Sequence, residues 1–173
     1  KVTNIFYNTP ARLKHLSSVH TELANIIEYV NKMALAYTNI KFLLTNDGKL
    51  TNLLTHPSSE INKTYIATCK GIACDEDLEP LRLGVTVEGV KYSPAKVEIA
   101  KINEEKETSI IKITIHEGKN REVKKMMEYV GYDVLKLNRE SFANLNTKGL
   151  YQGQYRRLTK EEINDLYDLV NKK

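Results

Sequence analysis

Cysteine is scarce in this chain, which excludes several classes of protein. Only two cysteines occur, Cys69 and Cys74, so there is neither a disulfide framework nor the second cysteine pair that a structural zinc site needs. This usage predicts a reducing compartment, the cytoplasm. The four histidines are scattered, and their spacing does not indicate a metal site. An apolar run of the roughly 18 residues that cross a bilayer is also lacking, so we expect no membrane segment.

Glycine and proline are few as well, with 8 and 4 residues, whereas 41% of the residues are hydrophobic. This composition excludes a mainly disordered chain, and 173 residues suffice for one ordinary domain or two small ones. The chain begins with Lys1 rather than methionine, and we expect it to be an internal piece of a larger protein.

Charge is nearly balanced overall but unevenly distributed. The net charge of +4 is compatible with a nucleic-acid partner without requiring one. Residues 116–157 hold nine basic side chains and five acidic ones, while acids gather at 75–79 and 104–107. The basic excess therefore lies in the C-terminal half of the chain.

The spacing of apolar residues predicts alternating short strands and helices. Recurrence every three or four residues predicts an amphipathic helix over residues 20–37. Further helices are expected at 75–83, 121–130 and 160–171, the middle one capped by Asn120. The expected strands are Ile5–Tyr7, Phe42–Thr45 with a turn at Asn46-Asp47-Gly48, Lys63–Cys69, Val85–Val87, Val90–Tyr92, Lys96–Ile102 and Ser109–Ile115. This order indicates an α+β fold, a mixed and mostly antiparallel sheet flanked by helices, with an N-terminal helical segment that begins at Asn8-Thr9-Pro10.

The helix expected at 121–130 is the most informative element. Its apolar stripe predicts one buried face, and the opposite face is basic. The basic residues at its start are Lys119, Arg121, Lys124 and Lys125. Free backbone amides at a helix start also favour anions, so a phosphate could be held by both. The same charges are equally typical of a solvated helix face.

Five motifs, in matching order and spacing over residues 43–173, resemble the RsuA/RluB family of RNA pseudouridine synthases. They are Leu43-Leu44-Thr45-Asn46-Asp47-Gly48 with Leu53-Leu54-Thr55-His56-Pro57, Lys63-Thr64-Tyr65, Glu117-Gly118-Lys119-Asn120-Arg121-Glu122-Val123-Lys124-Lys125-Met126, Leu137-Asn138-Arg139, and Gly153-Gln154-Tyr155-Arg156-Arg157-Leu158-Thr159. The resemblance implies isomerisation of uridine to pseudouridine in ribosomal RNA, without a metal and without an organic cofactor.

The resemblance also implies roles for particular residues. Tyr65 matches the family tyrosine that packs beside the target base, although strand aromatics are commonly buried. Lys124, after Val123, matches the basic position that pairs with the catalytic aspartate, and we place both in the substrate site. RNA phosphates would be contacted by Lys119, Arg121, Lys125, Arg139, Arg156 and Arg157; each alone is also consistent with an ordinary surface charge.

Residues 1–42 resemble a different family, the MutL DNA mismatch-repair ATPases. The resemblance rests on the string Phe6-Tyr7-Asn8-Thr9-Pro10-Ala11-Arg12 and on the helix that follows. We therefore interpret the chain as chimeric, with a MutL-like segment over 1–42, a synthase-like domain over 43–173 and a join near residues 40–48. No ATP-site residue can be assigned, and DNA would be a partner only under this alternative.

The join removes the residue on which the family's chemistry depends. The family aspartate, in a Gly-Arg-Leu-Asp motif, lies ten residues before the position of Thr45, where this chain has Leu35. A leucine supplies neither charge nor nucleophile, so we expect no catalysis. Asp47 is the nearest acid in the sequence but lies after the catalytic strand of the family. Three hypotheses stay open: a synthase segment, a mismatch-repair segment, and an RNA-binding remnant without catalysis.

Overall fold

The computed structural model describes residues 19–36, 42–45, 47–151 and 154–171. It divides into two compact units, one containing α2 (Val19–Ala36), the residues up to Leu44 and the segment Leu150–Arg156, the other Thr45–Gly149 with Arg157–Lys173. The expected strand Ile5–Tyr7 and the helix start at residues 8–10 lie outside the described residues. None of the helices in the described part of the chain combines the length and hydropathy that a membrane crossing needs.

Helix α2 of the first unit confirms the helix expected over residues 20–37. Leu23, Val30 and Met33 of the expected apolar stripe are half-buried, whereas Ile26 and Ile27 of the same stripe are exposed. Tyr29 and Leu35 are exposed, Leu35 with 64% of its surface accessible. Position 35 therefore lies on the solvent side of a regular helix.

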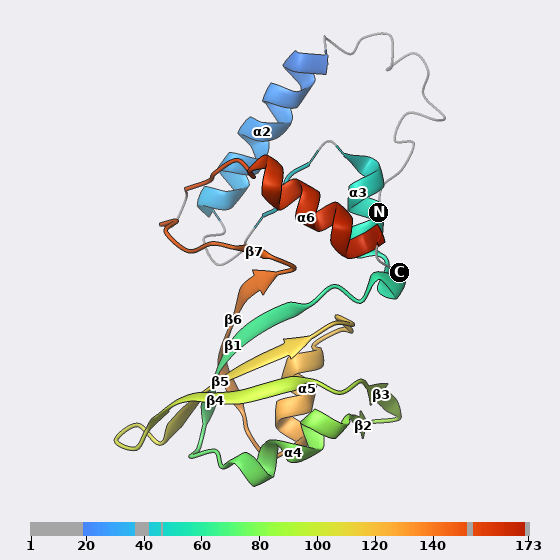
Figure 1. The fold of residues 1–173 in the computed structure, drawn as a ribbon. Coiled ribbons are helices and arrows are strands. Elements are labelled where there is room, and N and C mark those ends of the chain that lie inside the picture. The colour runs from blue at the N-terminus through green and yellow to red at the C-terminus, as the bar shows by residue number, and fades with distance from the viewer. Residues whose placement is uncertain (1–18, 37–41, 46, 152–153, 172–173) are drawn as a thin grey trace. The chain divides into compact units, whose positions relative to one another are not determined.

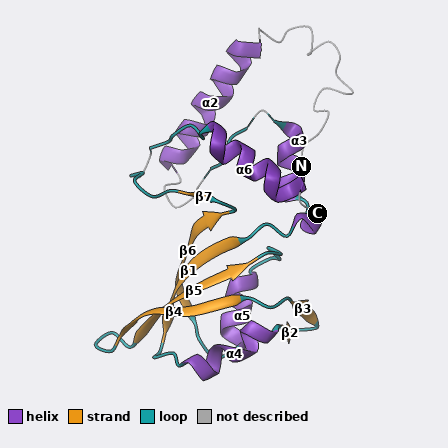
Figure 2. Ribbon diagram, in the orientation of Figure 1, coloured by secondary structure: helices purple, strands orange, loops and turns teal. Residues whose placement is uncertain are grey.

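The second unit is built on a five-stranded sheet with the strand order β4-β5-β1-β6-β7 (Figure 1). All of its pairings are antiparallel, and the flanking helices complete the expected α+β fold (Figure 2). The strands are β1 (Lys63–Lys70), β4 (Lys96–Asn103), β5 (Thr108–Ile115), β6 (Val134–Phe142) and β7 (Leu145–Asn146). Strands β6 and β7 were not expected.

One face of this sheet carries the main hydrophobic core. Alternate residues of β5, including Ile111 and Ile113, are buried on it, because successive side chains of a strand point to opposite faces. Met126 of α5 (Glu122–Tyr129) and Leu78 of α4 (Asp75–Leu83) belong to the same buried cluster. Both helices therefore cover the same face of the sheet, and α4 has the bounds that we expected.

A short hairpin follows α4 and consists of β2 (Val85–Val87) and β3 (Val90–Tyr92), again as expected. Gly84 makes the connection with φ +89, and a Cβ there would lie 3.0 Å from the carbonyl oxygen of Tyr92. Only glycine adopts this conformation at so close an approach. The hairpin is thereby directed toward the start of α5, where Lys125 contacts it.

A second, smaller core joins α3 (Gly48–Thr55) to α6 (Lys160–Asn171). The strand expected at Phe42–Thr45 is wrong, because those residues form no strand. Of the turn expected at residues 46–48, Asn46 lies outside the described residues, while Asp47 and Gly48 begin a helix instead. Asp47 is the N-cap of α3 and accepts a hydrogen bond from the Leu50 amide at 2.9 Å. Leu50 and Leu54 lie one helical turn apart and are buried against Leu166 of α6.

Candidate functional site

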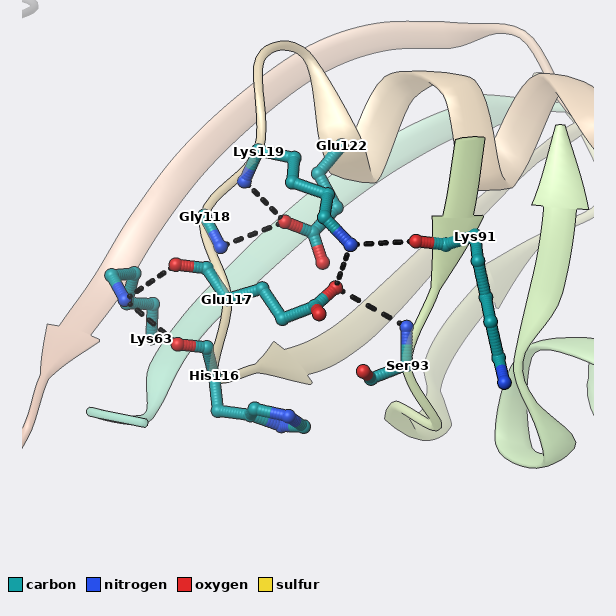
Figure 3. A network of polar contacts seen from close by, with 8 residues as sticks. All are labelled: Lys63, Lys91, Ser93, His116, Glu117, Gly118, Lys119 and Glu122. Carbon is teal, nitrogen blue, oxygen red and sulfur yellow. Dashed lines mark hydrogen bonds and ion pairs between the residues drawn. The ribbon is translucent and has the colours of Figure 1, made fainter. Parts of the chain in front are cut away.

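The loop of residues 116–121, between β5 and α5, is held by a buried carboxylate at the start of the helix. Arg121, with φ +53, occupies the N-cap position that we expected for Asn120, and its side chain makes no capping bond. Glu122 folds back instead, and its Oε2 accepts the amides of Gly118 at 2.8 Å and Lys119 at 2.6 Å (Figure 3). These two loop amides, which precede the first residue of α5, are therefore engaged within the protein.

Lys63 fastens the same loop to the start of β1. Its Nζ donates to the carbonyl oxygens of Ile61 at 3.0 Å, His116 at 3.1 Å and Glu117 at 3.3 Å. Burial lowers the pKa of Lys63, the Glu122 carboxylate opposes this shift, and the Arg139 guanidinium adds to it. A Cβ at Gly118 would lie 3.4 Å from the Lys63 side chain. The loop thus has two polar anchors, Lys63 and Glu122.

Two of the expected RNA-contacting lysines are engaged within the protein. Lys119 Nζ lies 2.8 Å from a Glu117 carboxylate oxygen and donates to the Lys91 carbonyl oxygen at 2.6 Å. It also lies 5.6 Å from the centre of the Tyr92 ring. Lys125 Nζ lies 2.5 Å from a carboxylate oxygen of Glu88. Both ammonium groups are therefore in contact with the β2–β3 hairpin or its flank.

The remaining residues of α5 differ in their accessibility. Arg121 is exposed and lies 3.9 Å from Glu128, a long and weak ion pair. Lys124 is half-buried and makes no ion pair with a described residue. Val123 is 3% exposed and packs in the main core. Of these two residues assigned to the substrate site, Val123 is buried and Lys124 is half-buried.

Strands β1 and β6 bring Tyr65 and Arg139 together, since the two are directly opposed in register. Tyr65 is half-buried at the margin of the main core. The Arg139 guanidinium lies 5.7 Å and the Lys63 ammonium 5.9 Å from the centre of the Phe142 ring. Lys63 and Tyr65 are two residues apart on β1 and share a face. The Phe142 ring is thus bordered by two cations, and Tyr65 shares its strand with one of them and is opposed in register to the other.

Three further residues named by the sequence lie apart from this cluster in the chain. Leu35 belongs to α2 in the first unit. Arg156 belongs to the first unit and Arg157 to the second, and both are exposed. Sequence reasoning missed the roles of Lys63, Glu122 and Glu88. Two of them stand inside the quoted motifs, Lys63 beside Tyr65 and Glu122 beside Val123, which was an available signal.

An antiparallel sheet covered on one face by helices, with basic side chains where α5 begins, defines an α+β domain. The family model described as RNA pseudouridylate synthase matches residues 42–129, about half of the chain. The chain belongs to this family.

Individual relatives agree with this assignment. Ribosomal large subunit pseudouridine synthase B of Bacillus subtilis (strain 168) is 39% identical over 170 residues, which cover 98% of this chain and 64% of the relative. Dual-specificity RNA pseudouridine synthase RluF of Salmonella typhi is 29% identical over 157 residues, covering 86% and 52%. A crystal structure of a pseudouridylate synthase aligns with a TM-score of 0.63 and 29% identity, covering 70% of this chain and 52% of the other. The chain spans about half to two thirds of the length of these relatives.

The resemblance of residues 1–42 to MutL finds no support in these comparisons. The alignment with the Bacillus subtilis synthase covers 98% of the chain and therefore extends into that segment.

Proposed function

We propose that this chain is the RNA-binding part of a pseudouridine synthase that acts on ribosomal RNA in the cytoplasm, and that the chain itself does not catalyse the isomerisation. The observation that carries the proposal is the placement of Tyr65 in register with Arg139, with Lys63 on the same face. The named activity of the Bacillus subtilis relative, a ribosomal large subunit pseudouridine synthase, supports ribosomal RNA as the substrate class.

The aromatic and basic groups suit an unpaired stretch of RNA. A base turned out of its stack packs against an aromatic ring, which is the role proposed for Tyr65. Neighbouring phosphates would be neutralised by Arg121, Lys125 and Arg139, while Arg156 and Arg157 are RNA contacts that the family resemblance implies. Residues 43–173 are the proposed synthase-like domain, and the boundary between the compact units after Leu44 supports a division close to that position.

The proposed lack of catalysis rests on Leu35. It lies on the exposed side of α2 and offers neither a nucleophile nor a base, a loss that typically costs a factor of about a thousand or more. Asp47 is not a substitute, because its carboxylate caps α3 at Leu50 and accepts a hydrogen bond from Tyr167. Lys124, the proposed partner of the family aspartate, makes no ion pair with a described residue.

RNA binding is tested by the double substitution Arg121→Glu with Lys125→Glu. We expect weaker retention of ribosomal RNA fragments in a filter assay over about 50–200 mM salt, and a salt slope smaller by about 1.4, since each lost phosphate contact removes about 0.7. Lys101→Glu with Lys106→Glu changes the net charge equally, at the opposite end of β5, and should have a smaller effect. Unchanged binding by the first variant would identify these charges as a solvated helix face.

Catalysis is tested by release of tritium from uridine labelled at the carbon that forms the new bond. We expect no release by the unmodified chain and none by Leu35→Asp, because the new carboxylate would lie on an exposed helix. Replacing residues 1–42 by a family segment with Gly-Arg-Leu-Asp should restore release, and Tyr65→Ala or Lys124→Met should abolish it again. Turnover by the unmodified chain would mean that another acid acts, with Asp47 the first to be tested.

The join proposed near residues 40–48 is open to a direct test. Codons 35–50 of the open reading frame, sequenced from an independent source, will show whether the join exists in nature. If the natural open reading frame encodes Gly-Arg-Leu-Asp upstream of Thr45, the proposal that the protein lacks catalytic activity fails.

A further inference from the structure

The β2–β3 hairpin contacts the start of α5 through three polar interactions, which we call the hairpin clasp. Glu88 is paired with Lys125, the Lys91 carbonyl oxygen accepts from Lys119, and the Ser93 amide donates to Glu117 at 3.2 Å. Figure 3 shows the last two of these contacts. Two of the four basic residues at the start of α5 are therefore neutralised within the protein: Lys125 by Glu88 of the hairpin and Lys119 by Glu117 of the loop.

The Glu88–Lys125 pair differs from the rest of the clasp. Lys119 is bonded to a main-chain carbonyl oxygen and to Glu117 of its own loop, so these contacts hold the hairpin in place. Glu88 lies in the hairpin turn, with φ +51, next to Gly89 at φ +77. Its side chain is 70% exposed and can rotate away into solvent without moving the strands.

The pair also resembles a phosphate contact in its chemistry. An anionic oxygen of Glu88 lies against the Lys125 ammonium, as an anionic oxygen of a phosphate would in a charge-assisted hydrogen bond. The bond to Lys125 lowers the pKa of Glu88, and the bond to Glu88 raises the pKa of Lys125. Both side chains are consequently ionised at neutral pH, and an RNA phosphate would have to take the place of Glu88.

We propose that Glu88 competes with RNA phosphate for Lys125, so that the hairpin weakens RNA binding at the start of α5. This inference rests on the proposed function. It adds Glu88 as a residue that influences which anionic ligands bind at the start of α5. An RNA that engages Arg121 and Arg139 at the same time holds a phosphate at high local concentration beside the pair, and so displaces the carboxylate more readily than a single anion does.

The test compares Glu88→Gln with the unmodified chain in the filter assay with ribosomal RNA fragments. An exposed ion pair is weak, so we expect affinity to rise about two- to fivefold. Glu105→Gln is the matched control, since it changes the net charge equally in the turn between β4 and β5, at the far end of a strand about 25 Å long. Its effect should be smaller. In a Lys125→Gln background the gain from Glu88→Gln should disappear.

Each outcome decides a different point. A gain of the same size in the Lys125→Gln background would overturn the inference, since it would reveal general repulsion of RNA by an acid rather than competition for one lysine. Unchanged or weaker binding by Glu88→Gln would overturn it as well, and would make the pair a brace for the hairpin. If the unmodified chain binds no RNA, the proposed function fails and this inference fails with it; binding without a gain refutes the inference alone.

Discussion

Replacement of Glu122 by alanine should destabilise the sheet unit far more than a surface substitution does. The carboxylate is 3% exposed and accepts two backbone amides of the loop before α5, at 2.8 Å and 2.6 Å. Alanine leaves both donors without their acceptor and removes the charge that Lys63 faces. The effect therefore combines lost hydrogen bonds with two unsatisfied donors in a partly buried site.

The magnitude follows from these two bonds. A hydrogen bond to a charged group contributes about 1.5–3 kcal/mol when buried. Because the loop is only partly buried, water replaces some of the loss, and we expect the free energy of unfolding to fall by about 2–4 kcal/mol. For a cooperative unit of roughly 120 residues, this corresponds to a decrease in Tm of about 8–15 °C. Glu122→Gln keeps an amide oxygen for the two donors and should cost about 1 kcal/mol.

Urea unfolding followed by circular dichroism measures this difference. Glu128→Ala is the control, since Glu128 lies on the same helix, is about half exposed and makes only a long ion pair; it should change stability by less than about 0.5 kcal/mol. If Glu122→Ala were as stable as Glu128→Ala, the carboxylate would not be holding the loop, and Lys63 alone would anchor it.

Three further results are expected. Met126→Ala, at a fully buried core position, should reduce the free energy of unfolding by about 2–5 kcal/mol, whereas Tyr129→Ala on the exposed side of the helix should change it by less than half as much in the same urea titration. Asp47→Asn should destabilise the protein at neutral pH, because hydrogen bonds from the Leu50 amide and then the Tyr167 hydroxyl lower the pKa of Asp47 in the folded state. The carboxylate stabilises the fold fully above its unfolded pKa of about 3.9, and this stabilisation is lost as the pH falls through the lower folded pKa. The melting temperatures of Asp47→Asn and the unmodified chain should therefore converge in acid. A thiol-reactive dye at about pH 8 should label Cys74 in the native protein and both cysteines in urea, because Cys69 is buried and burial raises its pKa to about 11, whereas Cys74 is exposed. The hydrogen bond with Asp77 raises the pKa of Cys74 as well, so its native labelling should be slower than in urea. Rapid native labelling of Cys69 would show that the core opens.

Several elements could be predicted from the sequence because their information is local. The three- and four-residue spacing of apolar residues was sufficient for α2, α4 and α6. Strict alternation over β5 and a turn at Glu88-Gly89 were sufficient for β5 and the β2–β3 hairpin. In each case the periodicity of the side chains matches the geometry of a single element, and no distant partner is needed to read it.

Strand β6 was missed because its pattern depends on its partner. Register shifts against β1, between Thr64 and Tyr65 and between Thr68 and Cys69, interrupt the two-residue alternation that identifies a strand. Helix α3 was missed because a cap residue followed by glycine is also typical of a turn. The buried contacts of Leu50 and Leu54 with Leu166, far along the chain, decide in favour of the helix.

The sequence by itself determined the family and most of the individual elements, since linked motifs and short-range periodicity survive without coordinates. Only the tertiary structure decided how the site is assembled. It opposes Tyr65 to Arg139 across β1 and β6, directs Glu122 back to the loop amides and pairs Lys125 with Glu88 of the hairpin. These contacts join residues whose partners are set by strand register and helix packing, and a charge pattern along the chain does not specify which acid each lysine meets.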